Sequence, residues 1–285
     1  ELVAPVSSQE LSALLIALAA FPGHNRVRVR GALPSAPYVA LTRACVEPFG
    51  ASIEVAAEDG GDVYEVHGPL LAPAQPLAVE PDASAAAVAL AAVAIGGGAG
   101  RVDGLTEHSA QGDRRFVEHA RAFGCAAGFD AAGAWIEGAP TRGARLDLAG
   151  EPDLAPVAAS LAAAVALRAR ERELGTSLLT GLATLRGKES DRIACLARGL
   201  ARLGLSVGHG PDFLRIAPGD AAASSDARVL DPLGDHRMAF AFALCSLAAP
   251  RVYVADPGCV SKSWPSFWRD LAKCGARVET HALEA

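Results

Sequence analysis

The sequence is short of aromatic residues and has no excess of positive charge. Phe, Trp and Tyr together make up 5% of its 285 residues, and the formal net charge at pH 7 is −6. A protein that binds nucleic acid offsets phosphate charges with Lys and Arg. The charge balance therefore argues against a nucleic-acid partner, and an anionic ligand would need a few locally placed cations.

Cysteine is sparse as well. The six cysteines are scattered along the chain, without a Cys-x-x-Cys pair or a cluster of histidines. Disulfide frameworks and zinc sites both depend on such clustering. We therefore expect reduced, buried thiols in a cytoplasmic protein, and neither a disulfide framework nor a zinc site.

Long hydrophobic runs are missing too. The most apolar stretches, 83–95 and 154–167, fall short of the ~20 residues that a membrane span requires, so we expect buried helices and no membrane association. The first residues lack the basic region and the cleavage site of a signal peptide. The only methionine is Met238 and the chain opens at Glu1, so we expect either a cleaved precursor or a fragment.

Apolar residues, in contrast, are abundant. Hydrophobic residues make up 51% of the chain, with many Ala, Leu and Val, and charged residues make up 20%. This composition supports a large core and excludes a disordered chain. The length corresponds to about two domains, and the composition favours helices packed closely on sheets.

A pattern of a helix end, a glycine and a short strand-like run occurs four times. Glycine ends a helix well because it adopts the left-handed conformation without a Cβ clash. The last such run covers residues 276–280. The four glycines are 74, 80 and 71 residues apart: Gly50, Gly124, Gly204 and Gly275.

A second series of helices is expected between these, each followed by another strand-like run. The unit reads strand, helix, strand, helix and one or two strands, which predicts an α/β fold of repeated βαβαββ units. A Pro/Gly-rich stretch at 69–76 predicts a linker, so the expected domains are residues 1–79 and 80–285. Side chains that can cap free backbone amides stand near the expected starts of these helices: Ser7, Asp82, Asp153 and Asp235.

A polar cluster stands at the first of these helix starts. Ser7, Ser8 and Gln9 precede an apolar helical run, and hydroxyls and an amide at a helix amino terminus suit a phosphate group. The alternative is an ordinary serine cap with a solvated neighbour. The residues alone leave both interpretations open.

Another cluster combines a carboxylate with two cations. The helix that follows it is expected to open at Ser190 or Glu189. Lys188, Glu189 and Arg192 then lie within one turn, with Glu189 and Arg192 on one face. Such a group can hold an anionic substrate and move a proton next to it. A solvated, charged first turn is the alternative, and spacing does not decide between the two.

Three further residues stand out singly. Arg237 occupies a helix start where the macrodipole favours carboxylates, which indicates an anionic ligand. Asp153 heads an apolar helix, where it is either a cap or a catalytic base. Lys262 precedes an amphipathic helix, where it is either an exposed loop residue or a ligand contact.

In this order and at these intervals, the motifs resemble the enolpyruvyl transferase family, in particular its members that act on shikimate 3-phosphate. The resemblance runs through nearly the whole chain and is most specific at 188–192 and 235–238. The matching stretches are 7–9, 12–15, 35–38, 82–84, 109–113, 152–153, 185–192, 235–238 and 256–263.

The resemblance implies six βαβαββ units in two globular domains, with the substrates bound between them and four of the six units present here. Residues 1–79 would belong to the upper domain and residues 80–285 would form the lower one. The implied reaction transfers the enolpyruvyl group of phosphoenolpyruvate to the 5-hydroxyl of shikimate 3-phosphate, releasing phosphate, in the shikimate pathway of aromatic amino-acid biosynthesis. It proceeds by addition and elimination through a tetrahedral intermediate, with no metal and no organic cofactor.

The same resemblance assigns roles to individual residues. Asp153 would be the base near the 5-hydroxyl, Glu189 would exchange a proton with the methylene carbon, and Lys262 would assist proton transfer near the leaving phosphate. Arg192 and Arg237 would clamp phosphoenolpyruvate, since a guanidinium binds carboxylate and phosphate in a bidentate way. The residues that would hold shikimate 3-phosphate are Ser7, Ser8, Gln9, Ser35, Tyr38 and Lys188.

The chain departs from the family pattern in several places. The family's early lysine, its Ser-Asn-Arg stretch, its Asn-x-Gly-Thr loop and a further arginine would lie before Glu1, and Ala36 stands where the family commonly has a basic residue. Pro81 and Gly187 are milder departures. We therefore expect an amino-terminal segment, supplied in cis or in trans, to complete the active site. Two alternatives remain: a catalytically silent fragment that at most binds shikimate 3-phosphate, and an enzyme that acts on UDP-N-acetylglucosamine.

Overall fold

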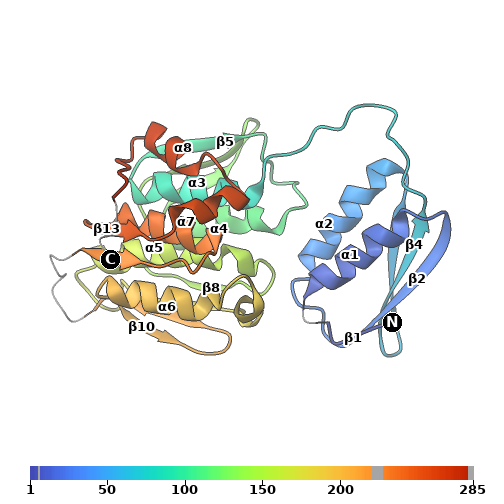
Figure 1. Cartoon of the computed structure of the whole chain (residues 1–285), viewed down its shortest axis with the longest axis horizontal. Coiled ribbons are helices and arrows are strands. Elements are labelled where there is room, and N and C mark those ends of the chain that lie inside the picture. Colours follow the sequence, from blue (N-terminus) through green and yellow to red (C-terminus); the bar gives the residue numbers. More distant parts are fainter. Residues whose placement is uncertain (6, 220–226, 282–285) are drawn as a thin grey trace.

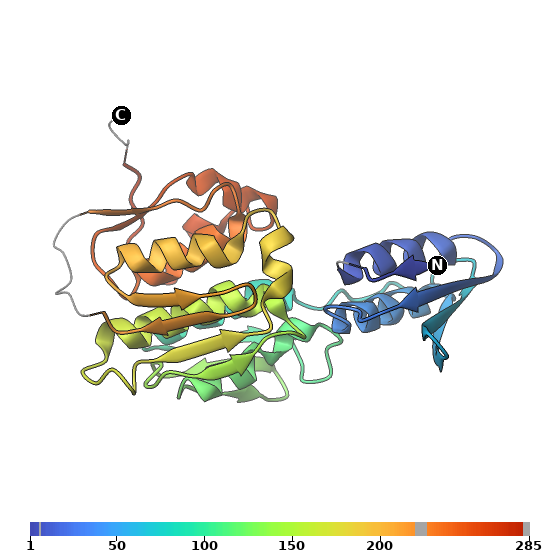
Figure 2. The ribbon, with the colours of Figure 1, turned by 90° about the horizontal axis from the view of Figure 1, so that it is seen from below.

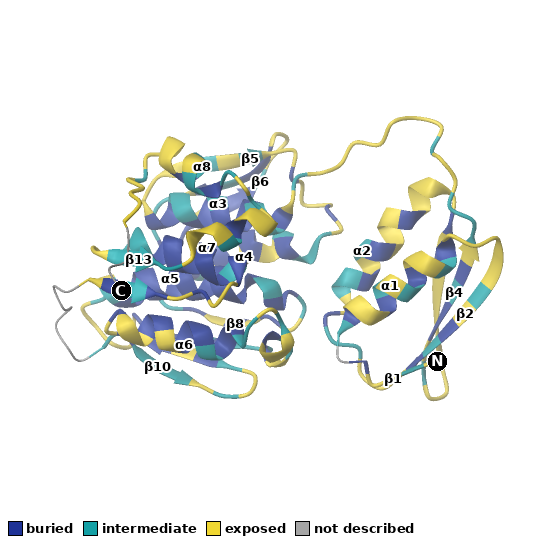
Figure 3. Ribbon diagram, in the orientation of Figure 1, coloured by how far each residue is buried: buried dark blue, intermediate teal, exposed yellow. Residues whose placement is uncertain are grey.

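The computed structural model describes residues 1–5, 7–219 and 227–281, and it has two lobes joined by an extended linker (Figure 1). The small lobe comprises residues 1–68 and the large lobe residues 82–281. Each lobe has its own buried hydrophobic core. The exposed residues of the linker separate the two cores along the chain (Figure 3).

The small lobe is a four-stranded sheet with two helices on one face (Figure 2). Leu11 and Leu15 of one helix pack on Val27 and Val66 of the sheet, and all four are buried. The other face of the sheet is charged and exposed, so this lobe buries only one side of its sheet. In chain order the elements are β1 (Leu2–Val3), α1 (Ser8–Ala19), β2 (Gly23–Arg30), α2 (Pro37–Val46), β3 (Ser52–Glu58) and β4 (Gly61–Gly68).

The large lobe continues the alternation of helices and strands. Its first half contains α3 (Ala83–Ile95), β5 (Ala99–Asp103), α4 (Phe116–Ala122), β6 (Ala126–Phe129), β7 (Gly133–Glu137), β8 (Arg145–Asp147) and α5 (Ala155–Arg168). Its second half contains β9 (Ser177–Thr180), α6 (Arg192–Arg202), β10 (Ser206–His209), β11 (Leu214–Ala217), β12 (Arg228–Leu230), α7 (His236–Ser246), β13 (Val252–Val254) and α8 (Phe267–Lys273).

One strand order recurs among the sheets. The small lobe has the order β1-β2-β4-β3, and the large lobe repeats it as β8-β9-β11-β10. In both sheets a parallel first pair is followed by two antiparallel pairs. The sheets β5-β7-β6 and β12-β13 each match part of this order. The recurrence explains why the sequence repeats its helix ends: all four glycines that were expected to end helices have a positive φ, between 81° and 97°.

One expected strand is wrong. Residues 276–280 form no strand, and the described chain after Lys273 contains no regular element. The run alternates polar residues with Val278, which remains 38% exposed. Without an apolar face to bury, such a run gains little by joining the short sheet β12-β13.

Three helices form the centre of the large lobe. Helices α3, α5 and α7 pack on one another, and every residue from Ala155 to Ala166 of α5 is buried. A helix that is apolar on all sides belongs in a core, which agrees with the prediction from the runs 83–95 and 154–167. No described helix is long and apolar enough to cross a membrane.

The cysteines follow the sequence expectation only in part. Cys125, Cys195 and Cys245 are buried free thiols, whereas Cys45 and Cys274 are exposed. Both exposed thiols lie near the ends of surface helices, and scattered spacing in the sequence does not distinguish a helix's buried face from its exposed one. No group of three or more His, Cys, Asp or Glu side chains suited to a metal occurs among the described residues.

Candidate active site

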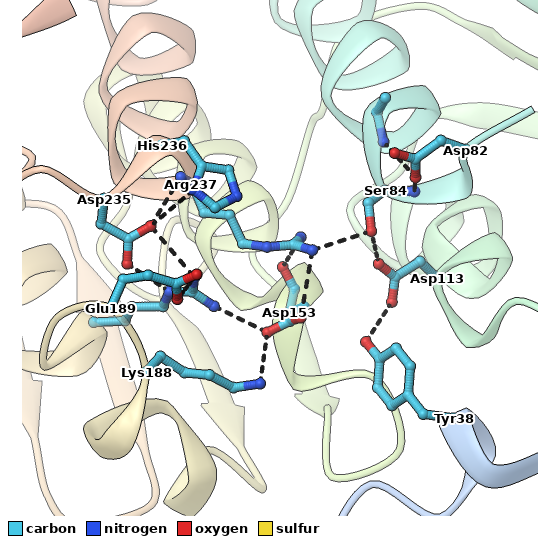
Figure 4. Close-up of polar contacts among 12 residues, drawn as sticks. Tyr38, Asp82, Ser84, Asp113, Asp153, Lys188, Glu189, Asp235, His236 and Arg237 are labelled. Atoms are coloured by element: carbon cyan, nitrogen blue, oxygen red, sulfur yellow. Dashed lines mark hydrogen bonds and ion pairs between the residues drawn. The ribbon is translucent and has the colours of Figure 1, made fainter. Parts of the chain in front are cut away.

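Of the polar residues singled out in the sequence, those of the large lobe and Tyr38 gather near the amino-terminal ends of the central helices (Figure 4). A small cavity of about 50 Å³ lies there, with walls from the first turns of α3, α5 and α7. The first helix is capped by Asp82 and the third by Asp235, whose carboxylates accept hydrogen bonds from backbone amides. Three positive helix ends therefore converge on one place, where they favour bound anions.

The turn before α6 differs from the sequence expectation. The helix begins at Arg192 and is capped by Asp191, whose Oδ1 accepts from the Ala194 amide at 3.0 Å, so neither Ser190 nor Glu189 opens it. Asp caps a helix better than Glu because its shorter side chain reaches the free amides. Lys188 and Glu189 consequently precede the helix.

Arg192 lies at the centre of the site. Its side chain is 1% exposed, and its guanidinium contacts three carboxylates. The contacts join Nη1 to Asp153 Oδ1 at 2.9 Å, Nη2 to Glu189 Oε2 at 2.7 Å, and Nε to Asp235 Oδ2 at 2.8 Å. A buried arginine with this many charged acceptors is held in one conformation.

Asp153 is the carboxylate with most cations around it. It lies in a 3-10 turn, Pro152–Leu154, directly before α5, and the expectation that it caps this helix is wrong, because α5 has no side-chain cap hydrogen bond. Besides Arg192, its carboxylate faces Lys188 Nζ at 3.5 Å and Arg237 Nη2 at 3.4 Å. Burial opposes ionisation, but Arg237, Lys188 and Arg192 outweigh it, so the pKa of Asp153 lies below its ordinary value. Asp153 is therefore ionised at neutral pH.

Glu189 and Lys262 form a second charged pair. Lys262 Nζ lies 2.7 Å from Glu189 Oε1, on the opposite side of the carboxylate from Arg192. Partial burial works against the charged form, yet the hydrogen bond from Lys262 and the charge of Arg192 lower the pKa of Glu189 to about 2. Glu189 is thus a carboxylate, and it becomes a proton donor only if these cations are drawn away.

A chain of contacts leads from Arg237 to the small lobe. Arg237 Nη2 lies 3.3 Å from Ser84 Oγ, and the Ser84 hydroxyl donates to Asp113 Oδ2. Tyr38, on α2 of the small lobe, donates its hydroxyl to Asp113 Oδ1 at 3.1 Å. Burial raises the pKa of Asp113 despite these hydrogen bonds. Tyr38 is thus the one predicted residue of the small lobe that the described structure joins to the cluster.

The other predicted residues of the small lobe lie apart from the cluster. Ser7 caps α1 by accepting from the Gln9 amide at 3.2 Å, which is the ordinary cap that the sequence left open. Ser8 and Ser35 are buried and Gln9 is exposed. No described hydrogen bond or ion pair links these four residues to the large lobe. The amino terminus of α1 nevertheless points toward the large lobe in both views (Figures 1 and 2).

Sequence reasoning gave no role to several residues that the structure brings into the site. Asp113 and Ser84 lie in stretches that matched the family, but neither was assigned a function. Asp235 was recognised only as a helix start, although it also binds Arg192. His236 lines the cavity, its Nδ1 has no hydrogen-bond partner among the described residues and lies 3.9 Å from Asp235 Oδ1, and burial together with Arg237 lowers its pKa. The family motifs were the available signal, since they already contained all four.

The site can bind anions and move protons. Its cations are Lys188, Arg192, Arg237 and Lys262, and all four are engaged by carboxylates. An anionic ligand competes with those carboxylates for the same cations, and each carboxylate that loses a cation becomes a stronger base. Anion binding and proton transfer are therefore coupled in this arrangement.

The family model that matches the chain is "EPSP synthase (3-phosphoshikimate 1-carboxyvinyltransferase)", over residues 1–271. Among curated relatives, the 3-phosphoshikimate 1-carboxyvinyltransferase of Nitrosomonas europaea is 42% identical over 268 residues, which cover 94% of this chain and 60% of the relative. The enzyme of the same name from Laribacter hongkongensis is 42% identical over 273 residues, covering 95% and 61%. The chain thus spans about 60% of the length of these relatives.

Solved structures agree on the fold. An EPSP synthase from Acinetobacter baumannii superposes with a TM-score of 0.68 at 23% identity, covering 95% of this chain and 61% of that one. The enolpyruvyl transferase NikO from Streptomyces tendae gives a TM-score of 0.65 at 18% identity, covering 91% and 57%.

Proposed function

The chain belongs to the EPSP synthase (3-phosphoshikimate 1-carboxyvinyltransferase) family, and we propose that it carries most of the active site for enolpyruvyl transfer from phosphoenolpyruvate to the 5-hydroxyl of shikimate 3-phosphate. The observation that supports this most is the buried Arg192, whose guanidinium holds two carboxylates suited to proton transfer, Asp153 and Glu189. A reaction that must both take and give a proton beside two anionic substrates needs such a group.

Binding of the substrates sets up the chemistry. Phosphate and carboxylate groups of the ligands compete for Arg237, Lys188 and Lys262, which in the free site contact Asp153 and Glu189. As these cations turn toward the substrates, the pKa values of both carboxyl groups rise toward the range in which they exchange protons readily. The substrates thereby activate the groups that act on them.

Each carboxylate then has one task. Asp153 accepts the proton of the 5-hydroxyl as the 5-oxygen attacks C2 of phosphoenolpyruvate. In the same addition step the methylene carbon receives a proton through Glu189. In the elimination step that carbon loses a proton back to Glu189 and the phosphate leaves, with Lys262 beside the departing group. The proton that Asp153 took from the 5-hydroxyl is released to the departing phosphate by way of solvent. The bond formed is C2 to the 5-oxygen, and the bond broken is C2 to the phosphate oxygen.

Arg237 and Arg192 bind phosphoenolpyruvate in this assignment. Arg237 is the more adaptable of the two, because its side chain is 22% exposed and its contacts with Asp153 and Ser84 are 3.2 Å or longer. Shikimate 3-phosphate takes Lys188 and Tyr38, with Ser7, Ser8, Gln9 and Ser35 approaching from the small lobe. The hydroxyls of Ser7 and Ser8 stand at the amino terminus of α1, where the helix dipole favours a phosphate.

The small lobe is completed by further chain. In the large lobe α3, α5 and α7 cover one another. In the small lobe the corresponding helix α1 leaves Ile16 47% exposed, and Phe21, which follows that helix, is 62% exposed. Two more units of the same order, supplied in cis or in trans, would cover α1 in the same way. On this basis residues 1–79 are the remaining part of an upper domain and residues 80–285 a lower domain.

A steady-state assay of phosphate release tests the proposal. The native gene product and the 285-residue chain are each given phosphoenolpyruvate with shikimate 3-phosphate or with UDP-N-acetylglucosamine. We expect the gene product to release phosphate with shikimate 3-phosphate alone. We expect the 285-residue chain to be at least ~100-fold slower, because the family pattern places further substrate-binding cations before Glu1. Release with UDP-N-acetylglucosamine, or none with either acceptor, would overturn the assignment.

A further inference from the structure

A buried ionic cluster lies beside the site and takes no part in the proposed chemistry. Glu151 is fully buried, and both of its carboxylate oxygens are bound. His119 Nε2 donates to Oε1 at 2.8 Å, and Arg115 Nη1 donates to Oε2 at 3.0 Å. His119 belongs to α4 and is itself buried, whereas the Arg115 side chain remains 45% exposed.

The cluster is next to Asp153 in the chain. Only Pro152 separates the two acidic residues, and its ring restricts the backbone between them. The Glu151 amide donates to Leu148 O at 3.2 Å, and its carbonyl accepts from the Leu154 amide at 3.0 Å. A displacement of Glu151 therefore moves the turn from which the Asp153 carboxylate projects.

The same cluster connects two turns of the site. Arg115 ends the 3-10 turn Gly112–Arg115, which also contains Asp113. A Cβ added at Gly112 would come within 3.9 Å of Glu151 Cβ, so the two turns lie close together. The turn that presents Asp113 to Tyr38 and the turn that presents Asp153 to Arg192 are thus held together through one carboxylate.

We propose that Glu151, held by His119 and Arg115, is a positioning residue that fixes the Asp153 turn among its three cations. Its role in turnover rests on the proposed function, whereas its effect on Asp153 does not. If Glu151 served stability alone, its replacement would leave the position and the pKa of Asp153 unchanged. If Glu151 positions Asp153, its replacement also lowers the rate, because a shift of a catalytic group by about 1 Å costs on the order of 100-fold.

The test compares Glu151→Gln with Glu118→Gln. Both residues contact Arg115, but Glu118 is exposed and lies 3.3 Å from Arg115 Nε on the surface of α4. The amide of the first variant satisfies only one of the two donors. The pKa of the Asp153 carboxyl is followed by carbon NMR in the 285-residue chain, with Asp153→Asn to assign the signal, and kcat and KM are measured in the native gene product.

We expect Glu151→Gln to raise the pKa of Asp153 by about one unit, the lower end of what adjacent cations contribute. It should also lower kcat by roughly 10-fold or more with little change in KM. Glu118→Gln should leave both the Asp153 pKa and kcat unchanged. An unaltered Asp153 pKa in a folded Glu151→Gln variant would overturn the proposal. If that variant does not fold, Arg115→Gln replaces it, since the Arg115 side chain is 45% exposed, and an unaltered Asp153 pKa there is equally decisive. If the Asp153 pKa shifts in the variant but the unsubstituted gene product shows no turnover, the positioning role is supported and the proposed function is contradicted.

Discussion

Arg192 Nη1 lies 2.9 Å from Asp153 Oδ1, although the two residues are 39 positions apart in the chain. The same guanidinium reaches Glu189 and Asp235, so one buried cation determines where three carboxylates lie. This relationship connects the stability of the large lobe with the chemistry proposed for it, because neither Asp153 nor Glu189 can be placed without Arg192.

Replacing Arg192 by Gln is expected to destabilise the large lobe. The variant leaves the fully buried Asp235 without its cation, and breaking a buried ion pair from one side costs about 3–5 kcal/mol. Urea denaturation measures this loss. The control is Arg101→Gln. Arg101 lies on β5 and pairs with Asp130 at the surface, so its loss should cost at most about 1 kcal/mol. Equal losses in the two variants would contradict the central position of Arg192.

Glu189→Gln tests the proton transfer to the methylene carbon. The amide keeps the shape of the side chain but cannot donate or accept the proton, so turnover should fall on the order of 100-fold or more. Exchange of the methylene protons of phosphoenolpyruvate into deuterated water, followed by proton NMR, should fall with it. The exposed Glu118→Gln serves as the control. Normal exchange in the Glu189 variant would remove Glu189 from this step.

Arg237→Lys tests the binding of phosphoenolpyruvate. A lysine retains the charge but offers no planar fork for a carboxylate or phosphate. We expect KM for phosphoenolpyruvate to rise by roughly 10-fold, with a smaller change in kcat and in KM for shikimate 3-phosphate. The exposed Arg269→Lys should change none of these constants. A change confined to kcat would show that Arg237 acts on the transition state rather than on binding.

The charge on Asp153 predicts how stability depends on pH. Its pKa in the folded chain lies below the ordinary value of about 3.9, so its ion pairs stabilise the fold above that pH. The contribution is lost as the pH falls below about 4 and through the folded pKa. Urea midpoints at a series of pH values should therefore decline more steeply for the parent chain than for Asp153→Asn between pH 4 and 2. Parallel curves would contradict the ion pairing, and Asp103→Asn, at the exposed end of β5, controls for the loss of an acidic residue.

Local signals in the sequence predicted the helices well. Ser7, Asp82 and Asp235 cap α1, α3 and α7 as expected, because a short polar side chain before an apolar run is sufficient information. The start of α6 was placed wrongly because three adjacent polar residues could each cap it. Spacing does not distinguish them, whereas the folded backbone selects Asp191.

Contacts between distant parts of the chain could not be predicted in this way. Asp113 and Tyr38 are 75 residues apart, and Glu151 meets His119 across 32 residues. In the sequence Glu151 is an ordinary acidic residue before a proline, and only the fold shows that it is buried and doubly bound. The motifs of the family located the site, but the partners of each charge followed from how the helices pack.

The most direct test of the account is the pKa of the Asp153 carboxyl, measured by carbon NMR in the native gene product with and without saturating shikimate 3-phosphate. If the ligand takes Lys188 from Asp153, the pKa should rise by at least about one unit on binding, toward the range of a useful base. A pKa that stays below its ordinary value when the ligand is bound would contradict the exchange of cations between carboxylates and substrates.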